Sequence, residues 1–405
     1  MQTNLPEQLL ATDNGQRAND IMRSCVHCGF CNATCPTYQI TGDELDGPRG
    51  RIYLMRELLE TGNNPERTTF HLDRCLTCRA CETTCPSGVA YGELAEITRN
   101  SIGVKRAGLD GHSRTFLQWL IPQAGRLRRM ARLGKMFRFA VPKHLARHLP
   151  ATIGKAWRTP SIDSSASGNP GALSVVLLNG CAQQVSTPNT NIALAGLLQA
   201  HGVRVSAVPQ EGCCGSLDLH LGDEARALQR IRHNVDVLFA HAEAADAIIS
   251  SASGCGVTLK DYARLLAHDE AYAARAAAVA AKVRDASEFL NELDVAWTKA
   301  RSIDRVAWHS PCTLQHGQQC VDVVETLLRN AGYALTPVPD SHLCCGSAGT
   351  YSVLQPQLSE HLKTDKWAAL MSGQPELVAT ANVGCQTHLA AGQDVDVVHW
   401  VELLK

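Results

Sequence analysis

Short apolar runs alternate with longer helical patterns through the C-terminal part of the chain. Runs typical of buried strands occupy 173–178, 203–208, 247–250, 305–308, 333–338 and 377–380. Segments rich in Ala and Leu, such as 191–201 and 320–330, lie between them and have helical spacing. Because alternating strands and helices are typical of parallel sheets, the pattern predicts an α/β fold with duplicated parallel sheets.

The N-terminal part has a helical pattern instead. Within 49–61, Ile52, Met55 and Leu59 recur on one helical face, between a proline and a glycine that mark the helix ends. We therefore expect a helical N-terminal domain, joined to the α/β part of the chain.

A basic segment lies between these two parts. Residues 111–162 contain eleven Lys or Arg and no acidic residue. The apolar positions of this segment are Phe116, Leu117, Trp119, Leu120 and Ile121, followed at helical spacing by Leu127, Met130, Leu133, Met136 and Phe137. The basic residues among the second group are Arg126, Arg128, Arg129, Arg132 and Lys135. This basic amphipathic pattern predicts a docking surface for a membrane or a partner subunit; the alternative is a helix packed on the chain's own domains.

Length and composition fit a protein of several globular domains. The chain has 405 residues, of which 45% are hydrophobic and 19% charged, enough for two or three domains. Lys plus Arg number 38 against 39 Asp plus Glu, and we expect no nucleic-acid partner. The first residues lack the pattern of a secretory signal, and no apolar run approaches the roughly 18 residues that cross a bilayer.

We predict domains at 1–110, 171–300 and 301–405, with a basic connector at 111–170 that ends in a flexible linker, 161–171.

Sixteen of the 17 cysteines form two duplicated patterns, of which the first is C-x2-C-x2-C-x3-C-P. It occurs twice, with an offset of 50 residues, at Cys25, Cys28, Cys31 and Cys35 and at Cys75, Cys78, Cys81 and Cys85. Bacterial ferredoxins hold two [4Fe–4S] clusters with this spacing, and the fourth cysteine of each motif binds the other cluster. We therefore predict one cluster on Cys25, Cys28, Cys31 and Cys85, and a second on Cys75, Cys78, Cys81 and Cys35. Structural zinc sites use paired C-x2-C arms instead of triplets. His27, between two ligands, is expected to be a partly exposed loop residue.

The second pattern contains a Cys-Cys-Gly triplet between two single cysteines. It occurs at Cys181, Cys213, Cys214 and Cys255, and again 130 or 131 residues later at Cys312, Cys344, Cys345 and Cys385. In each copy the cysteines follow three predicted strands. Because the carboxyl ends of parallel strands share one edge of a sheet, we expect the four thiols of each copy to converge there. The remaining Cys320 is expected in the helix at 320–330, as a buried small hydrophobe.

These motifs resemble the cysteine-rich CCG domain of heterodisulfide reductase subunits and of quinone-linked dehydrogenase subunits. Together with the ferredoxin-type motifs, the resemblance rests on the stretches TCPTYQITGDELDGPRGRIYLMRELLE and DSHLCCGSAGTY. Over its whole length the chain is similar to the iron–sulfur subunits of bacterial glycolate oxidase. The resemblance implies a hetero-oligomeric complex in which flavoprotein subunits carry FAD and oxidise glycolate to glyoxylate. It also implies a cytoplasmic protein, peripheral on the cytoplasmic face of the bacterial inner membrane, that passes electrons toward the quinone chain.

The chain departs from the fuller CCG pattern, which ends in C-x-x-C. Thr258 and His388 stand where that pattern has its last cysteine, which speaks against a five-thiolate cluster in either copy. A four-thiolate iron–sulfur cluster, zinc and an unmetallated thiol pair remain open for the two CCG sites. His309 and His388 are further candidates for a ligand or a proton donor, although structural histidines are commoner.

The sequence also lacks the motifs of a substrate-oxidising subunit. No G-x-G-x-x-G follows a predicted strand and there is no P-loop. We therefore expect a non-flavin electron-transfer subunit of a glycolate dehydrogenase complex that does not oxidise substrate alone. The alternatives are an electron-transfer subunit for lactate or glycerol 3-phosphate oxidation, a heterodisulfide-type thiol–disulfide reductase, and a metal-stabilised binding module without a redox role.

Overall fold

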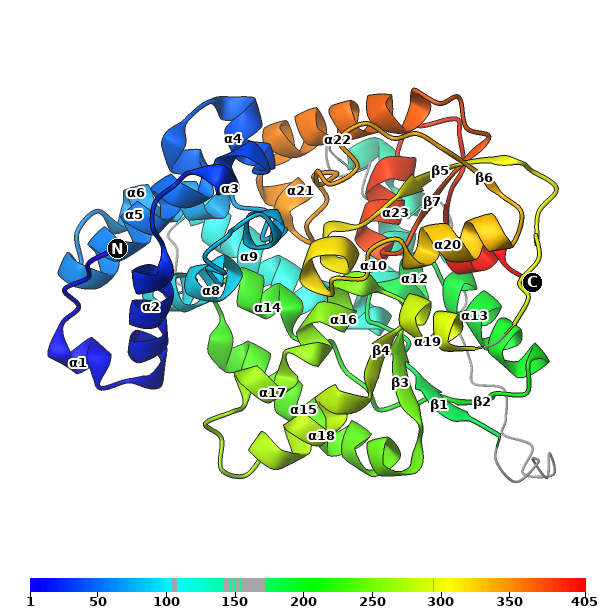
Figure 1. Cartoon of the computed structure of the whole chain (residues 1–405), viewed down its shortest axis with the longest axis horizontal. Helices are drawn as coiled ribbons and strands as arrows, with labels where there is room; N and C mark the ends of the chain where they lie inside the picture. The colour runs from blue at the N-terminus through cyan, green and yellow to red at the C-terminus, as the bar shows by residue number, and fades with distance from the viewer. Residues whose placement is uncertain (104–107, 142–145, 147–148, 151–152, 154–171, 294) are drawn as a thin grey trace.

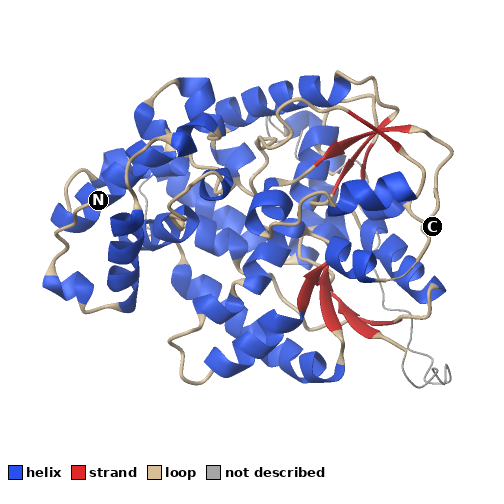
Figure 2. Cartoon of the chain, in the orientation of Figure 1, coloured by secondary structure: helices blue, strands red, loops and turns tan. Residues whose placement is uncertain are grey.

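The computed structural model describes residues 1–103, 108–141, 146, 149–150, 153, 172–293 and 295–405. A group of helices formed by the N-terminal residues lies on one side of the molecule, and two separate sheets lie on the other (Figures 1 and 2). The predicted linker at 161–171 and the basic residues Lys143, Arg147, Lys155 and Arg158 lie outside the described residues. Every strand of the described residues comes after residue 172, so the predicted mixture of a helical N-terminal part and α/β halves is confirmed.

Residues 1–103, which we call the N-terminal module, are built from short helices around one small core. The helices are α1 (Glu7–Leu10), α2 (Asp13–Ser24), α3 (Phe30–Ala33), α4 (Pro36–Thr41), η1 (Glu44–Asp46), α5 (Pro48–Thr61), α6 (Pro65–Asp73), α7 (Ala80–Thr83) and α8 (Tyr91–Ile102). Helix α5 begins at a proline, which is favourable because the first helical N–H has no partner within the helix. Ile52, Met55 and Leu59 of α5 are buried, as the sequence pattern predicts.

The two ferredoxin-type motifs of this module have the same local backbone. In the loop after α2, His27 and Gly29 have φ of 57° and 85°, and in the loop after α6, Thr77 and Arg79 have φ of 53° and 60°. A left-handed backbone costs a residue with a side chain roughly 1–2 kcal/mol, so other contacts must hold this loop. Arg99 of α8 supplies them, because its guanidinium donates to Thr77 Oγ1 at 2.9 Å and to the Leu72 carbonyl at 2.8 Å. His27 is a half-buried loop residue.

The basic connector forms two helices, α9 (Gly108–Leu120) and α10 (Ala124–Met136), followed by the short helix η2 (Arg138–Ala140). The expected apolar patch at its start is divided between two faces. Leu117 is buried, whereas Phe116 and Trp119 are each 46% exposed. Arg114 is buried as well, because it forms ion pairs with Asp73 at 2.9 Å and Asp110 at 2.8 Å. Helix α10 keeps the predicted spacing and exposes Met130, Leu133 and Met136, and Phe137, which follows it, is exposed too.

The rest of the chain forms two halves with the same topology. The first half contains a parallel sheet of strand order β2-β1-β3-β4, and the second a parallel sheet of order β6-β5-β7-β8. The strands are β1 (Ser174–Leu177), β2 (Arg204–Ser206), β3 (Ala247–Ser250), β4 (Val283–Asp285), β5 (Arg305–His309), β6 (Ala334–Thr336), β7 (Leu377–Thr380) and β8 (Val397–His399). All six expected strands are present, whereas β4 and β8 were not predicted.

Helices connect and cover these strands. In the first half they are α12 (Gln183–Ser186), α13 (Asn189–Ala200), α14 (Ser216–His220), α15 (Glu224–Ala244), α16 (Ser253–Lys260), α17 (Tyr262–Leu265), α18 (Ala273–Lys282) and α19 (Ala286–Glu292). In the second half they are η3 (Thr313–Gly317), α20 (Val323–Asn330), α21 (Tyr351–Leu354), α22 (Pro356–Met371), α23 (Val383–Ala390) and η4 (Trp400–Leu403).

The expected helix at 320–330 is wrong at its start. Helix α20 begins at Val323 because Asp322 has a left-handed backbone with φ of 60°, which a continuous helix does not allow. Cys320 therefore lies in the preceding loop, where its N–H donates to the Leu314 carbonyl at 3.1 Å. Its side chain is nevertheless buried in the apolar core, as expected.

The two halves share one hydrophobic core. It joins Val175 and Leu177 of β1 to Val306 and Trp308 of β5, and it includes the fully buried Trp400. Polar contacts cross between the halves at the strand ends. The Ser253 N–H donates to the Ala381 carbonyl at 3.1 Å, and His399 Nε2 lies 2.8 Å from the Ser251 carbonyl oxygen.

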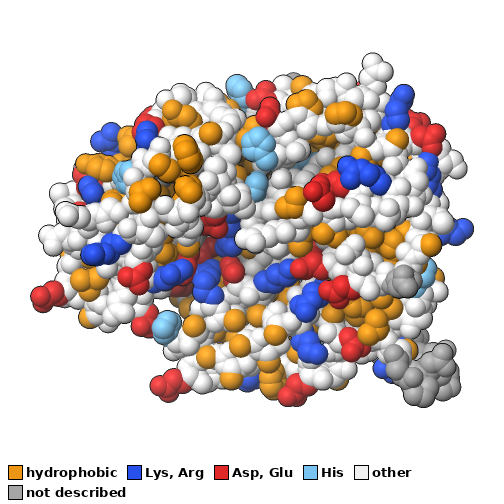
Figure 3. Space-filling view, in the orientation of Figure 1, with side chains coloured by type: hydrophobic (Ala, Val, Ile, Leu, Met, Phe, Trp, Pro, Cys, Tyr) orange, Lys and Arg blue, Asp and Glu red, His pale blue; other side chains and the backbone are white. Residues whose placement is uncertain are grey.

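The N-terminal module meets the two halves in different ways. Its contact with the first half is charged: Arg79 pairs with Asp261 at 2.9 Å, and Arg264 lies 3.3 Å from Glu96. Figure 3 shows acidic and basic side chains gathered where the N-terminal helices face the first half. Its contact with the second half includes an apolar cluster with Leu76 and Tyr351, besides hydrogen bonds such as that between Thr83 and His316 at 2.9 Å.

Candidate metal centres

The first group of thiols lines a cavity between α3, α5 and the loop after α7. Cys25, Cys28, Cys31 and Cys85 line it together, with Cys81 at its inner side; we call this site I. Burial and the neighbouring Cys25 raise the pKa of the Cys31 thiol to about 11. Cys28 is exposed, and Val26 and Phe30 beside it are 68% and 62% exposed. Site I is therefore the ferredoxin-type site that reaches the surface.

The second group lines a neighbouring cavity, with Cys35, Cys75, Cys78 and Cys81 around it; we call this site II. The buried Arg51 places its Nη1 atom 3.9 Å from Cys35 Sγ and donates from Nε to the His71 carbonyl at 2.8 Å. Burial alone would raise the pKa of the Cys75 thiol, but the positive charges of Arg51 and Arg99 lower it. Arg51 and Arg99 thus favour the thiolate of Cys75, whereas burial raises the pKa of Cys78 and Cys81.

The two cavities pair the cysteines across the repeat. Cys85 lies with the first three cysteines of the other motif, and Cys35 does the same at site II. Each cavity is thus lined by one predicted crossed set of four cysteines, and Cys81 lines both cavities. A set of four convergent thiols suits an iron–sulfur cluster, because soft thiolate ligands select iron–sulfur or zinc. The assignment of each cysteine as a ligand stays a prediction.

In the first half, the structure brings the four cysteines to the carboxyl edge of the sheet. Cys213 lies between Cys181 and Cys214, and hydrogen bonds from these thiols hold the pKa of Cys213 well below its usual value. Cys214 also contacts the Cys255 thiol, and its pKa is raised by the neighbouring thiols and by burial. Gly215 follows with φ of 93°, which lets the chain turn sharply after the paired thiols.

A carboxyl group that the sequence analysis did not single out lies at this site. Glu211 lines the same cavity as Cys181, Cys214 and Cys255. Its Oε1 accepts hydrogen bonds from the N–H groups of Asn179 at 2.5 Å and Gly180 at 2.9 Å. Burial nevertheless raises the pKa of Glu211 to about 8. In the sequence, the one sign of such a role is that Glu211 lies two residues before the Cys213–Cys214 pair.

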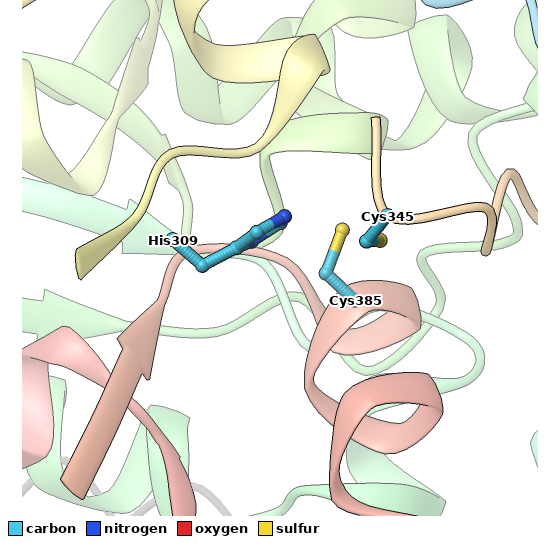
Figure 4. A group of neighbouring side chains, drawn as sticks. All are labelled: His309, Cys345 and Cys385. Carbon is cyan, nitrogen blue, oxygen red and sulfur yellow. The ribbon is translucent and has the colours of Figure 1, made fainter. Parts of the chain in front are cut away.

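The second half brings its cysteines together in the same way, with Cys312 Sγ 3.9 Å from Cys344 Sγ and Cys345 in contact with Cys385. A histidine joins them. One ring nitrogen of His309 and the sulfurs of Cys345 and Cys385 all lie within 4.8 Å of one another (Figure 4). Burial, Lys366 and His388 lower the pKa of His309 to about 3.

His388, the second candidate histidine, is also buried, with its Nε2 atom 3.4 Å from Ser359 Oγ.

Site II and the second-half site are neighbours. Cys78 of site II and Cys312 and Cys344 of the second half pack in one apolar cluster with Leu76 and Tyr351. The Tyr351 hydroxyl donates to the Arg74 carbonyl at 3.1 Å, which fixes this contact between the module and the second half. No side chain of the first-half site belongs to that cluster of described residues.

A helical module with two four-thiol cavities, joined to two parallel α/β halves with converging cysteines, defines an iron–sulfur protein of the cysteine-rich type. Family models match accordingly: a 4Fe-4S dicluster domain at residues 21–89, and a cysteine-rich domain at 175–260 and 306–390. The glycolate oxidase iron-sulfur subunit of Escherichia coli K12 is 44% identical over 408 aligned residues, covering 100% of this chain and 98% of that protein. The chain belongs to the family of glycolate oxidase iron-sulfur subunits.

Further relatives extend the comparison. The probable glycolate oxidase iron-sulfur subunit of Bacillus subtilis is 30% identical, covering 97% of this chain and 94% of that protein. Lactate utilization protein A of Anoxybacillus flavithermus is 26% identical over 57% of this chain and 99% of its own length. Among solved structures, that of a hypothetical protein from Helicobacter pylori matches with a TM-score of 0.53 at 10% identity, over 98% of this chain and 72% of that one, which shows the fold alone.

Proposed function

We propose that this chain is the electron-transfer subunit of a flavin-dependent glycolate oxidase, which converts glycolate to glyoxylate. FAD on a partner flavoprotein would accept the two electrons of the substrate, and this chain would pass them on one at a time toward the respiratory quinone pool. When bound, the two [4Fe–4S] clusters supply one-electron carriers, which the protein positions and tunes. The full-length similarity to glycolate oxidase iron-sulfur subunits supports this assignment.

The observation that carries the proposal is the order of the thiol sites in space. Site I has an exposed cysteine, Cys28, with exposed apolar neighbours that suit contact with another subunit. Cys81 lines the cavities of both site I and site II, and Cys78 of site II packs with Cys312 of the second half. The thiols thus form a continuous series from the surface to the CCG region, which supports the proposed path of the electrons.

We also propose that α9 and α10 dock the chain on the membrane surface. Among the described residues no helix is long and apolar enough to span a membrane. Phe116, Trp119 and Phe139 are 46%, 46% and 88% exposed, and the Arg126 guanidinium lies 4.8 Å from the centre of the Trp119 ring. Aromatic side chains beside cations suit the interface of an anionic leaflet, where each basic residue contributes about 1 kcal/mol.

A charge-reversal variant tests that docking surface. Arg129 and Arg132 are exposed on α10, and their replacement by Glu should release the chain from vesicles that contain anionic lipid at physiological salt. Cosedimentation with neutral vesicles is the control, and unchanged binding to anionic vesicles by the double variant rules the surface out.

Lactate is the second candidate substrate of the complex, because lactate utilization proteins align with 57% of this chain. The full-length relatives favour glycolate, since they cover both the N-terminal module and the two halves.

The deciding experiment uses the complete complex with its flavoprotein subunits, purified without oxygen. Glycolate should reduce the iron–sulfur centres of this chain within one turnover, as seen by freeze-quench electron paramagnetic resonance, whereas lactate and glycerol 3-phosphate should not. The isolated chain with glycolate is the control and should remain oxidised. Turnover of glycolate by the complex with its iron–sulfur centres still oxidised would exclude the proposed role.

A further inference from the structure

We propose that His309 is a metal ligand of the second half, where its Nε2 atom joins the sulfurs of Cys345 and Cys385 in a mixed thiolate–imidazole centre. In the first half, Leu178 stands at the position equivalent to His309. The inference goes beyond electron transfer from a flavin, because it requires neither a substrate nor a partner subunit and can be tested on the chain alone.

The first support is an unsatisfied buried nitrogen. His309 ends β5 and is only 2% exposed. Its Nδ1 lies 2.9 Å from Thr380 Oγ1, whereas its Nε2 has no hydrogen-bond partner among the described residues. A buried polar atom without a partner destabilises the fold, so such an atom calls for an explanation such as a bound metal. Figure 4 shows the imidazole ring pointing toward the sulfur of Cys385, with Cys345 beyond it.

The second support is how the ring is held. The Thr380 hydroxyl oxygen, 2.9 Å from Nδ1, can accept a hydrogen bond from Nδ1–H, and in that tautomer Nε2 is unprotonated and able to bind a metal. Thr380 is completely buried at the end of β7, beside β5, so the sheet itself sets the orientation of the ring. The side-chain amide of Asn382 in turn donates to Cys385 Sγ at 3.6 Å. Both ligands therefore have the outer hydrogen bonds that metal ligands generally require.

The third support is the contrast with the first half. The 131-residue offset places Leu178 at the position of His309, and Leu178 lines the cavity of Cys181, Cys214 and Cys255. A general requirement of the fold for a polar residue at this strand end would apply to both halves. Because the first half has an apolar side chain there, the histidine of the second half is specific to its site.

The donor set indicates the chemical class of the metal. Thiolate sulfur with imidazole nitrogen suits zinc and iron, which share this chemistry. Ligands of a single tetrahedral zinc ion lie roughly 3.8 Å apart, given zinc–sulfur bonds of about 2.3 Å. The His309 nitrogen and the sulfurs of Cys345 and Cys385 lie within 4.8 Å of one another, so a small shift of the side chains would bring them to one ion. The experiment must therefore distinguish zinc from an iron–sulfur centre with one histidine ligand.

The test uses the full chain, purified without oxygen from cells fed ¹⁵N-histidine. Mass spectrometry gives the iron and zinc content, X-ray absorption at the zinc edge gives the ligands of any zinc, and electron–nuclear double resonance detects nitrogen bound to paramagnetic iron. We expect one directly bound histidine nitrogen, on a metal additional to the two ferredoxin-type clusters. In His309→Leu, which copies the first half, this nitrogen should disappear and the metal should be lost to a chelator at least about tenfold faster.

The matched control is His399→Gln, because His399 is equally buried but both its ring nitrogens have partners, the Ser251 carbonyl and the Val401 N–H. This variant should keep the nitrogen signal. The wild-type measurement needs no variant, so a folding defect in His309→Leu does not weaken the test. An all-sulfur ligand shell, a nitrogen signal that persists in His309→Leu, or no metal beyond the two ferredoxin-type clusters would each overturn the proposal. Reduction by glycolate is not part of the readout, so the proposed function stands or falls separately.

Discussion

The two halves of this protein have the same strand order and nearly the same cysteine spacing, yet their thiol sites have different surroundings. The first-half site has Leu178 and the buried carboxyl group of Glu211 beside its thiols. The second-half site has His309 instead, and the buried Lys366 lies nearby, held by the Asp340 carbonyl at 2.7 Å. A duplicated scaffold has thus kept its four thiols and changed the polar groups around them.

The halves also differ in how they contact the N-terminal module. Ion pairs such as Arg79 with Asp261 join the module to the first half, whereas an apolar cluster that contains three thiols joins it to the second. The Arg79–Asp261 pair is only partly exposed, at 16% and 25% for its two side chains, whereas the apolar cluster excludes water and brings Cys78 close to Cys312 and Cys344. We therefore expect that, of the two halves, the second lies nearer to the proposed path of the electrons.

The largest expected effect is therefore on electron transfer. In the complex, Cys345→Ala should slow the passage of electrons from glycolate to a quinone analogue by at least about tenfold, because it removes a proposed ligand of the site beside Cys78. Cys214→Ala, its counterpart in the first half, should change that rate by less than about twofold. Stopped-flow reduction of the quinone analogue measures both variants. Equal losses in the two variants would show that electrons need both halves.

The next comparison concerns the glycine after each cysteine pair. A Cβ at Gly346, whose φ is 84°, would lie 2.6 Å from the Ser359 carbonyl oxygen, which is backbone and cannot rotate away. A Cβ at Gly215 would meet the Ile231 side chain at 3.1 Å, which has more freedom to adjust.

We expect Gly346→Ala to lower the free energy of unfolding by about 4 kcal/mol and Gly215→Ala by about 2 kcal/mol. Both variants place an alanine in a left-handed backbone conformation, but only the alanine at position 346 also clashes with a backbone atom. Urea denaturation of the anaerobic protein measures this. A Gly215→Ala protein that is the less stable of the two would contradict the geometry.

A smaller effect is expected on acid sensitivity. His399 ends β8 at the register position that Asp285 occupies at the end of β4. Burial lowers the pKa of His399 to about 4, so its contribution to stability is present above its usual pKa of 6.5 and is lost as the pH falls toward 4. Burial raises the pKa of Asp285 above 3.8, so its contribution is present below 3.8 and is lost as the pH rises. Acidification therefore lowers the free energy of unfolding through His399 and does not lower it through Asp285.

Between pH 7 and pH 5, His399 should cost the protein about 2 kcal/mol of stability. His399→Gln removes the titrating group and should make the free energy of unfolding less dependent on pH over this range. Denaturation at both pH values, with wild type alongside to account for acid-labile clusters, measures the difference. The same pH dependence in both proteins would mean that other groups dominate.

The smallest expected effect is that of Leu178→His, which gives the first half the histidine of the second. Ser250 occupies the place of Thr380 at the end of the neighbouring strand and offers the ring a hydroxyl. We expect a loss of stability of about 1 kcal/mol and one additional histidine nitrogen bound to metal. X-ray absorption and urea denaturation provide the two readouts. A first half without bound nitrogen would show that the imidazole alone does not make the second-half centre.

The sequence alone determined the periodic parts of this protein. The repeats of 50 and about 131 residues predicted the paired ferredoxin-type loops and the duplicated halves, because ligand spacing is a local property of the chain. The apolar runs located six strands, since buried strands are continuous in sequence. The helix at 48–61 was predictable from its face of Ile52, Met55 and Leu59 and from the residues at its ends. The domain boundaries at 110, 170 and 300 stay predictions.

Only the tertiary structure decided which polar groups share a site. Leu117 and Arg114 are buried although their segment is basic and amphipathic, because Asp73 on another helix neutralises the arginine. Asp322 delayed the start of α20 and left Cys320 in a loop, a backbone choice that helical spacing does not reveal. The sequence named His309 only as one candidate among others. Its meeting with Cys345 and Cys385 depends on strands and helices up to 76 residues apart, which a parallel sheet brings to one edge because its strands all end there.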